Sequence, residues 1–423
     1  MEPAPEAGEP RLTWDRATEP ATAVELHLSE RCGLADRADR LIQGDNLRVA
    51  LSLLEDGLAS RFQLLYLDPP FASEVDYRHE VHVQERGKSI QRRAYYDAWP
   101  GGLSGYLDML APRLEAMHRL LSDEGSLYLH LDHHSVHYVK VLLDEIFGRD
   151  NFQREIIWRI GWVSGFKSAA RNWIRNHDTL LFYVKDKKRF FFEKTYLPYP
   201  PGYRRRDGQL PKGQGIPLED VWNASPADSL DSIQIMSFSG EKSGFNTQKN
   251  IALLERILHA STRPGDLVGD FFAGSGTTCV AAAGMKDPDS GAPAPRRWIG
   301  VEQSDLGIAL ARTRLLERGA SAFTIERARE PEPKMASPYR ALRRASNRIE
   351  LIEQDGALPL ESWSIGHQEG AAFVGRWHTW RSLGRKRSAP PLVAELETAS
   401  AESLHVQVHD IEGRRHRLPV EDA

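Results

Sequence analysis

Cysteine is scarce in this chain of 423 residues, which contains only Cys32 and Cys279. Because these two lie far apart and no Cys-x-x-Cys pair exists, the sequence argues against a disulfide framework and a cysteine-based zinc site. It also has no apolar run as long as a membrane span and no visible signal peptide. We therefore expect a soluble, cytoplasmic protein with no membrane partner.

Positive charge is not in excess either, because the formal net charge is −4. A surface that binds nucleic acid must therefore be a local patch rather than the whole chain. Hydrophobic residues make up 41% of the sequence, which is enough for one large α/β domain and a smaller one.

The tetrapeptide Asp68-Pro69-Pro70-Phe71 follows an apolar run over residues 62–67 that is typical of a buried strand. Proline cannot continue a strand ladder, so a stiff turn is expected at the carboxyl end of the strand, where ligands bind in open α/β sheets. There, Asp68 and the carbonyl of Pro69 could accept both N–H groups of a nucleobase amine and stabilise the charge that develops on it. Without further context, a surface turn or a helix cap explains the tetrapeptide equally well.

A second stretch, residues 270–278, contains Gly274 and Gly276 between an expected strand and an expected helix. In this arrangement the backbone approaches a ligand closely and the N-terminus of the helix faces it. The next expected strand ends at Glu302, and an acid at that place in such folds holds the hydroxyl groups of a ribose. The second stretch therefore favours a functional role for the first.

With these stretches in this order, the chain resembles amino-group DNA methyltransferases of the β arrangement, including the modification subunits of type III restriction systems. The resemblance rests on residues 68–71, 247–249 and 270–277, and it covers roughly residues 40–320. It implies methyl transfer from S-adenosylmethionine to the exocyclic amine of a base flipped out of double-stranded DNA. The implied fold is a doubly wound, Rossmann-like α/β sheet with permuted motif order.

The resemblance also implies site roles. The catalytic residues would be Asp68, Pro69, Pro70 and Phe71. The cofactor-binding residues would be Asp45, Thr247, Lys249, Asp270, Phe272, Gly274, Ser275, Gly276, Thr277 and Glu302. Within this set, Thr247 and Lys249 would hold the carboxylate of the cofactor's methionine part. Asp45 would lie near its adenine, although Asp45 equally fits the N-cap of a helix over residues 47–54.

Composition and the motifs together divide the chain into six expected segments. These are a disordered tail (1–24), the catalytic half of the methyltransferase domain (25–160), a target-recognition region (161–245), the cofactor half of the methyltransferase domain (246–326), a proline-containing linker (327–348) and a small β-rich module of unknown role (349–423).

Basic residues interleaved with aromatic residues make the region 161–245 the expected DNA surface. Its candidate DNA-binding residues are Lys167, Arg171, Arg204, Arg205 and Arg206, and a solvated charged loop is the alternative for any one of them. The polar segment 72–100 is expected to be a flap over the extruded base, with an ordinary solvated loop as the alternative.

The cluster Asp132-His133-His134, with His137 close behind, has metal-ligating side chains. Adjacent histidines point in different directions, however, and the transfer of a preformed methyl group needs no metal. We therefore expect no metal here and expect Asp132 or His133 to line the base pocket.

The identity of Asp68 favours N6 of adenine as the target, because an ionised acceptor makes the stronger hydrogen bond. Cytosine enzymes of the family more often carry serine at this position. The alternatives are an N4-cytosine methyltransferase, an RNA or protein-amide methyltransferase, and a non-catalytic DNA-binding subunit. The recognition sequence, the oligomeric state (a homodimer is one option) and a restriction-nuclease partner all stay open.

Overall fold

The computed structural model describes residues 12–14, 21–33, 39–73, 76–83, 88–159, 171–222, 249–320, 322–328, 337–382, 388–397 and 403–422. For residues 76–83 and 88–96 only the backbone is described. No helix within these ranges is both long enough and apolar enough to cross a membrane.

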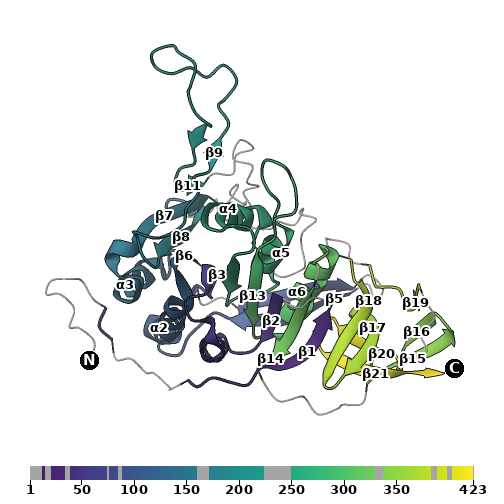
Figure 1. Cartoon of the computed structure of the whole chain (residues 1–423). Helices are drawn as coiled ribbons and strands as arrows, with labels where there is room; N and C mark the ends of the chain where they lie inside the picture. The colour runs from purple at the N-terminus through teal and green to yellow at the C-terminus, as the bar shows by residue number, and fades with distance from the viewer. Residues whose placement is uncertain are drawn as a thin grey trace.

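The two halves of the methyltransferase domain share one parallel sheet, although the catalytic half comes first in the chain (Figure 1). Neighbouring strands of this sheet come from distant parts of the sequence, as expected for a doubly wound fold with permuted motif order. The parallel strands lie in the order β14 (Phe323–Arg327), β2 (Asp39–Gln43), β13 (Arg297–Glu302), β12 (Leu267–Asp270), β3 (Phe62–Leu67) and β6 (Leu121–Leu131).

Helices cover both faces of this sheet and create two hydrophobic cores. Along β3, Leu65 and Leu67 belong to one core, whereas Leu64 and Tyr66 belong to the other. The strand is therefore buried on both faces, which explains its continuous apolar sequence. One face carries α1 (Asn46–Leu53), its π-helical continuation η1 (Leu54–Leu58), α2 (Leu103–Leu120) and α3 (Val136–Phe147), and the other carries α4 (Ile251–Ser261), α5 (Thr277–Gly284) and α6 (Asp305–Glu317).

Part of the expected recognition region 161–245 belongs to this sheet, while the boundaries of the region stay a prediction. Strand β8 (His177–Val184) pairs antiparallel with both β6 and β7 (Phe152–Arg159), which follows a 3-10 turn η3 (Arg149–Asn151). Strand β11 (Val221–Trp222) runs parallel to β7 at the sheet edge. Between β8 and β11 the chain leaves the body as a projecting arm that carries β9 (Tyr196–Leu197) and β10 (Ile216–Pro217) (Figure 1).

The segment 72–100 is also more ordered than its sequence suggests. Strands β4 (Asp76–Val83) and β5 (Lys88–Tyr96) pair antiparallel, so the expected flap is a hairpin rather than an irregular loop. Charged residues on both strands hid the alternation that would have indicated this pairing.

The C-terminal module is β-rich, but the sheet runs into it without a break (Figure 1). Strand β1 (His27–Cys32) pairs antiparallel with β14 and parallel with β18 (Ala372–Trp380), and so joins the two parts. Beyond β18 lie β17 (Leu360–Glu369), β20 (His405–Asp410), β21 (Arg415–Asp422), β15 (Tyr339–Ala345), β16 (Arg348–Glu353) and β19 (Val393–Glu395).

Two further expected segments contain ordered residues, although their boundaries stay a prediction. The expected linker 327–348 contains strand β15, because Tyr339 and Ala341 are buried in the core of the module. The expected disordered tail 1–24 makes specific contacts where it is described. Trp14 Nε1 donates a hydrogen bond to Asp108 of α2 over 2.6 Å, and Val24 N donates one to Ser52 of α1 over 2.8 Å. The proline-rich composition of both segments concealed these few anchoring residues.

Candidate active site

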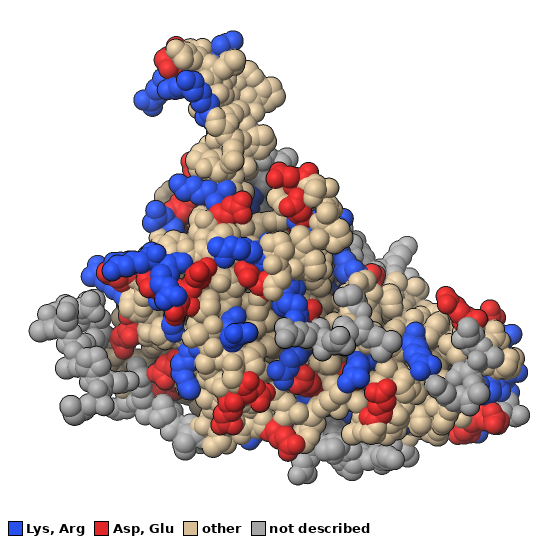
Figure 2. All heavy atoms as spheres, viewed as in Figure 1, with Lys and Arg blue, Asp and Glu red and all other residues tan. Residues whose placement is uncertain are grey.

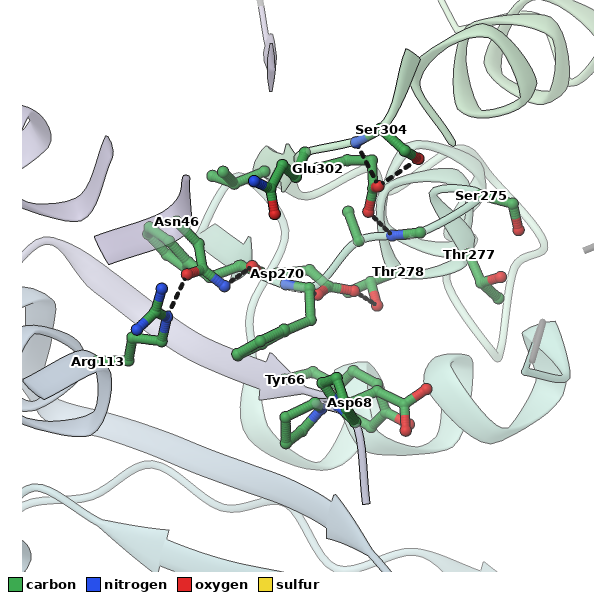
Figure 3. A pocket seen from close by; sticks show the side chains of 18 of the residues that line it. Asn46, Tyr66, Asp68, Arg113, Asp270, Ser275, Thr277, Thr278, Glu302 and Ser304 are labelled. Carbon is green, nitrogen blue, oxygen red and sulfur yellow. Dashed lines mark hydrogen bonds between the residues drawn. The ribbon is translucent and has the colours of Figure 1, made fainter. Parts of the chain in front are cut away.

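A cavity of about 600 Å³ lies at the carboxyl ends of β2, β3, β12 and β13 (Figure 3). Each of these strands ends in an acidic residue or leads into one, so four carboxylates reach the same cavity. The predicted site residues that line it are Asp45, Asp68, Pro69, Pro70, Phe71, Lys249, Asp270, Phe272, Gly274, Ser275, Thr277 and Glu302. The predicted Thr247 lies outside the described residues.

The glycine loop is held by the carboxylate of Asp270, at the end of β12. This side chain accepts hydrogen bonds from Phe272 N over 3.0 Å and from Thr278 Oγ1 over 2.5 Å. Gly276 has a φ of +75°, and a Cβ there would lie 2.7 Å from Cβ of Ala311. Gly276 is not among the residues that line the cavity, so its glycine is required by the turn and by packing against α6.

Glu302 links the end of β13 to the same loop (Figure 3). Its carboxylate accepts hydrogen bonds from Gly274 N over 2.9 Å and from Ser304 N over 2.8 Å. Burial raises the pKa of Glu302, and these hydrogen bonds partly offset that effect. Oε1 also accepts a hydrogen bond from Ser304 Oγ over 2.6 Å, whereas Oε2 accepts the one from Gly274 N and has a second lone pair for a ligand in the cavity.

Asp45 combines the expected N-cap of a helix with a position in the wall of the cavity. It caps α1 by accepting a hydrogen bond from Arg48 N over 3.1 Å, and it also lines the cavity. Its second oxygen accepts a hydrogen bond from Arg113 of α2 over 2.7 Å. Arg113 in turn reaches Asn46, whose amide donates to the carbonyl of Phe271 over 2.8 Å (Figure 3).

The turn after Asp68 is fixed by Asp97, a residue that the sequence did not single out. The buried Asp97 carboxylate accepts hydrogen bonds from the backbone N–H groups of Phe71, Ala72 and Ser73 over 2.9–3.1 Å. Ala72 has a φ of +58°, a left-handed conformation that residues other than glycine rarely adopt. Asp97 therefore stabilises a strained backbone directly beside the expected catalytic residues and anchors the β4–β5 hairpin to it.

Asp68 is paired with Lys249 at the start of α4. Lys249 Nζ lies 3.0 Å from Asp68 Oδ1 and 5.1 Å from the centroid of the Phe71 ring. Among the described residues Asp68 Oδ1 has no aligned hydrogen bond, so the contact with Lys249 is an ion pair and not a directed hydrogen bond. The side chains are 16% exposed for Asp68 and 12% for Lys249.

A chain of buried polar groups lies behind the tetrapeptide. Tyr66 Oη and His130 Nδ1 share a hydrogen bond of 2.8 Å, and His130 Nε2 lies 3.3 Å from Asp178. Burial would raise the pKa of Asp178, but His130, Lys249 and the hydrogen bond from Arg175 hold it well below its usual range. The His130 ring lies 5.9 Å from that of Phe71, so this network supports the ring of the tetrapeptide.

The Asp132-His133-His134 cluster does not line the cavity. The expectation that Asp132 or His133 contacts the target base therefore stays a prediction. Asp132 is 2.8 Å from His134 Nδ1 and 3.6 Å from Arg175, which means that its carboxylate already has partners. His130, two residues earlier on β6, is the histidine that faces the tetrapeptide.

The acids of the cavity outnumber its bases. Asp45, Asp68, Asp270 and Glu302 line it, whereas the only described cations that do so are Arg113 and Lys249. Burial raises the pKa of Asp270 to about 7, and the negative charges of Asp68 and Glu302 add to this effect. Such an excess of buried acid suits a ligand that carries positive charge.

The arm that carries Arg204, Arg205 and Arg206 projects from the body that contains the cavity (Figure 1). Arg204, Arg205 and Arg206 are exposed on the arm, and Figure 2 shows basic side chains along one side of its tip. Arg171 is exposed just before β8, and Lys167 lies outside the described residues. The rings of Tyr199 and Tyr203 stack at 5.1 Å between centroids and stiffen the arm beside the arginines.

Several known proteins match about three fifths to two thirds of this chain. Type II methyltransferase M.EcaI of Enterobacter cloacae is 28% identical over 62% of this chain and 66% of its own length. The Mod subunit of the type III restriction-modification enzyme StyLTI of Salmonella typhimurium is 22% identical over 59% of this chain and 50% of the subunit. The DNA adenine methyltransferase YhdJ of Escherichia coli is 27% identical over 66% of this chain and 83% of YhdJ.

The chain thus spans less than two thirds of M.EcaI and half of the StyLTI subunit. A model of the DNA methylase family, which comprises N6 and N4 enzymes, matches residues 62–311. This match runs from β3 through the glycine loop into α6 and covers more than half of the sequence. The chain therefore belongs to the DNA methylase family of amino-group methyltransferases that use S-adenosylmethionine.

Proposed function

We propose that this protein methylates N6 of adenine in double-stranded DNA at a specific sequence. The observation that carries the proposal is the shared cavity, where Asp68, Pro69 and Phe71 face the glycine loop and Glu302. An acceptor for an amine and a site for a nucleoside cofactor therefore lie side by side, as methyl transfer between them requires.

The residues of the cavity suit S-adenosylmethionine. The volume of about 600 Å³ is typical of a small-molecule site. Glu302 would hold the ribose hydroxyls, and the excess of acids would favour the positive charge of the cofactor. When bound, the cofactor supplies a methyl group on a sulfonium that is ready for attack by a nucleophile.

The tetrapeptide would activate the amine of the target base. The carboxylate of Asp68 and the carbonyl of Pro69 accept its two N–H groups, which frees the nitrogen lone pair for attack. Phe71 stacks on the base after it has left the duplex. The nitrogen gains the methyl group and releases one proton, for which Asp68 is the adjacent acceptor.

Adenine is favoured over cytosine because an ionised acceptor makes the stronger hydrogen bond to an amine. YhdJ, by its name an adenine enzyme, supports this choice. The StyLTI subunit, by its name part of a restriction-modification enzyme, supports a nuclease partner as a further element of the proposal.

Nucleoside mass spectrometry on DNA treated with the purified protein and S-adenosylmethionine tests the reaction. N6-methyladenine is the expected product, and N4-methylcytosine would overturn the choice of base. Asp68→Ala should lower the transfer rate by roughly a thousandfold, since it removes an interaction made in the transition state. Wild-type turnover in this variant would refute the role of Asp68.

We assign DNA contact to the arm because its arginines are exposed on a stiff projection. Replacing Arg204, Arg205 and Arg206 by alanine should weaken DNA binding and flatten its dependence on salt. A triple variant of Arg340, Arg343 and Arg344, on β15, removes the same charge elsewhere and serves as the control. Equal losses in the two variants would show that the arm is not the DNA surface.

A further inference from the structure

Lys249 lies where the target base must bind. The base needs the carboxylate of Asp68 for its amine and the face of Phe71 for stacking, and Lys249 Nζ lies 3.0 Å from Asp68 Oδ1 and 5.1 Å from the centroid of the Phe71 ring. These are two separate contacts of one ammonium group, and both block the same site. While they persist, the base cannot engage its acceptor.

The pairing of Lys249 with Asp68 is of a kind that can exchange. Both side chains are largely buried, and the ammonium is not aligned for a hydrogen bond to Asp68 Oδ1. A largely buried ammonium needs an anionic partner, so Lys249 can leave Asp68 only if another anion takes its place.

The cofactor brings such an anion in its amino-acid carboxylate. Of the two described cations that line the cavity, Arg113 is held by Asp45, by Asn46 and by the carbonyl of Met109. Within the described residues, Lys249 has an ion pair with Asp68, a contact with the Phe71 ring and a longer-range attraction to Asp178, but no hydrogen bond that holds it. Lys249 is thus the cation that an incoming carboxylate can recruit.

We propose that Lys249 occupies the base site before the cofactor binds and that the carboxylate of the cofactor then attracts Lys249 away from Asp68. Cofactor binding then uncovers Asp68 and Phe71, so the base enters after the cofactor and never meets a site without a methyl donor. This inference rests on the proposed function, and it makes Asp68 and the cofactor carboxylate competitors for one ammonium group.

Calorimetry with two ligands tests this competition without DNA. S-adenosylhomocysteine carries the amino-acid carboxylate, whereas 5′-methylthioadenosine has the same nucleoside and lacks it. Asp68→Asn frees Lys249, so it should bind S-adenosylhomocysteine about fivefold more tightly than the wild type. Its affinity for 5′-methylthioadenosine should stay the same, because that ligand does not use Lys249.

The Lys249→Gln variant completes a double-mutant cycle of Asp68 and Lys249. It should bind S-adenosylhomocysteine roughly tenfold more weakly, and adding Asp68→Asn to it should restore nothing. The affinities of Asp68→Asn for the two ligands can be compared without any Lys249 variant. This comparison therefore tests the competition for Lys249 even if Lys249→Gln does not fold.

Three results would contradict the inference. An unchanged or weaker affinity of Asp68→Asn for S-adenosylhomocysteine would show that Asp68 does not compete for Lys249. An equal gain in affinity for both ligands would show that the effect of Asp68→Asn does not depend on the carboxylate of the ligand. Failure of the wild-type protein to bind either ligand would refute the proposed function itself. This outcome can be distinguished from a failure of the inference alone, because the other two results require that the ligands bind.

Discussion

The buried charges where the C-terminal module joins the domain are paired, whereas the buried charges of the cavity are mainly acids. At the junction, Glu30 of β1 and Arg312 of α6 are both almost fully buried and lie 2.7 Å apart. Ser364 and Gln407 of the module add hydrogen bonds to Arg312 and Glu30, respectively. Burial would raise the pKa of Glu30, but Arg312 holds it at about 2.

Helix α6 connects these two regions. Arg312 points to the junction, while Arg314, two residues further on, donates hydrogen bonds to Ser275 O over 2.7 Å and to Thr277 Oγ1 over 2.9 Å. On one side of α6, Arg312 forms an ion pair with Glu30. On the other side, the helix packs against the cavity, in which acidic side chains outnumber basic ones. Burial of charge alone therefore does not mark a functional site, and the imbalance of charge is the better indicator.

The largest expected effect is on stability at the junction. Arg312→Met leaves Glu30 buried without its partner, and should lower the free energy of unfolding by about 3–5 kcal/mol. Denaturant unfolding followed by circular dichroism measures this loss. The matched control is Arg344→Met, which removes an exposed ion pair with Glu350 and should shift the unfolding midpoint very little.

The double variant Glu30→Leu with Arg312→Met sharpens this test. It removes both charges together, so most of the lost stability should return. If the double variant is no more stable than Arg312→Met, the loss reflects packing of the long arginine side chain rather than an unpaired charge.

The acids of the cavity should produce the opposite behaviour, a gain of stability when a charge is removed. Burial raises the pKa of Asp270 from 3.8 to about 7, so the folded state binds more protons than the unfolded state between these pH values. Stability should therefore fall as the pH rises from about 4 to about 7 and level off above that range. Asp270→Asn should flatten this slope and gain up to about 4 kcal/mol at pH 8.

Urea unfolding at a series of pH values from 4 to 8 measures the slope. Glu302, whose pKa is also raised, should leave a smaller slope in the Asp270→Asn variant. A wild-type protein whose stability does not change over this range would mean that Asp270 is ionised in the folded state.

The smallest of these effects concerns the affinity for the cofactor. Glu302→Ala should weaken the binding of S-adenosylmethionine by roughly 1.5–3 kcal/mol, as for the loss of charge-assisted hydrogen bonds. Calorimetry measures the affinity, and denaturant unfolding of the same variant measures the stability lost with the hydrogen bonds from Gly274 N and Ser304 N. A large loss of stability with unchanged affinity would make Glu302 a structural residue that only holds Gly274 and Ser304.

The sequence by itself determined the ends of the strands and the turns beyond them. The prolines after Asp68 stop β3, and the glycine at position 276 permits the left-handed turn into α5. These are properties of a few adjacent residues, so a local pattern is enough to predict them. Because parallel strands end at one edge, the pattern also predicted that Asp68, Asp270 and Glu302 would meet.

Tertiary structure alone decided which other side chains contact the residues at the carboxyl ends of the parallel strands. Asp97 binds the turn at Phe71, Arg113 binds Asp45, and Lys249 covers Asp68, although each partner comes from a different segment. No periodicity or motif encodes such a contact, because it depends on how strands are ordered in the finished sheet.

The junction follows the same rule. Glu30 and Arg312 belong to segments that are nearly 300 residues apart, and only the pairing of β1 with both β14 and β18 brings the C-terminal module against α6. A strand accepts any neighbour with free backbone groups, so its own residues do not specify its partners. The order of the strands was therefore fixed by the packing of the whole chain.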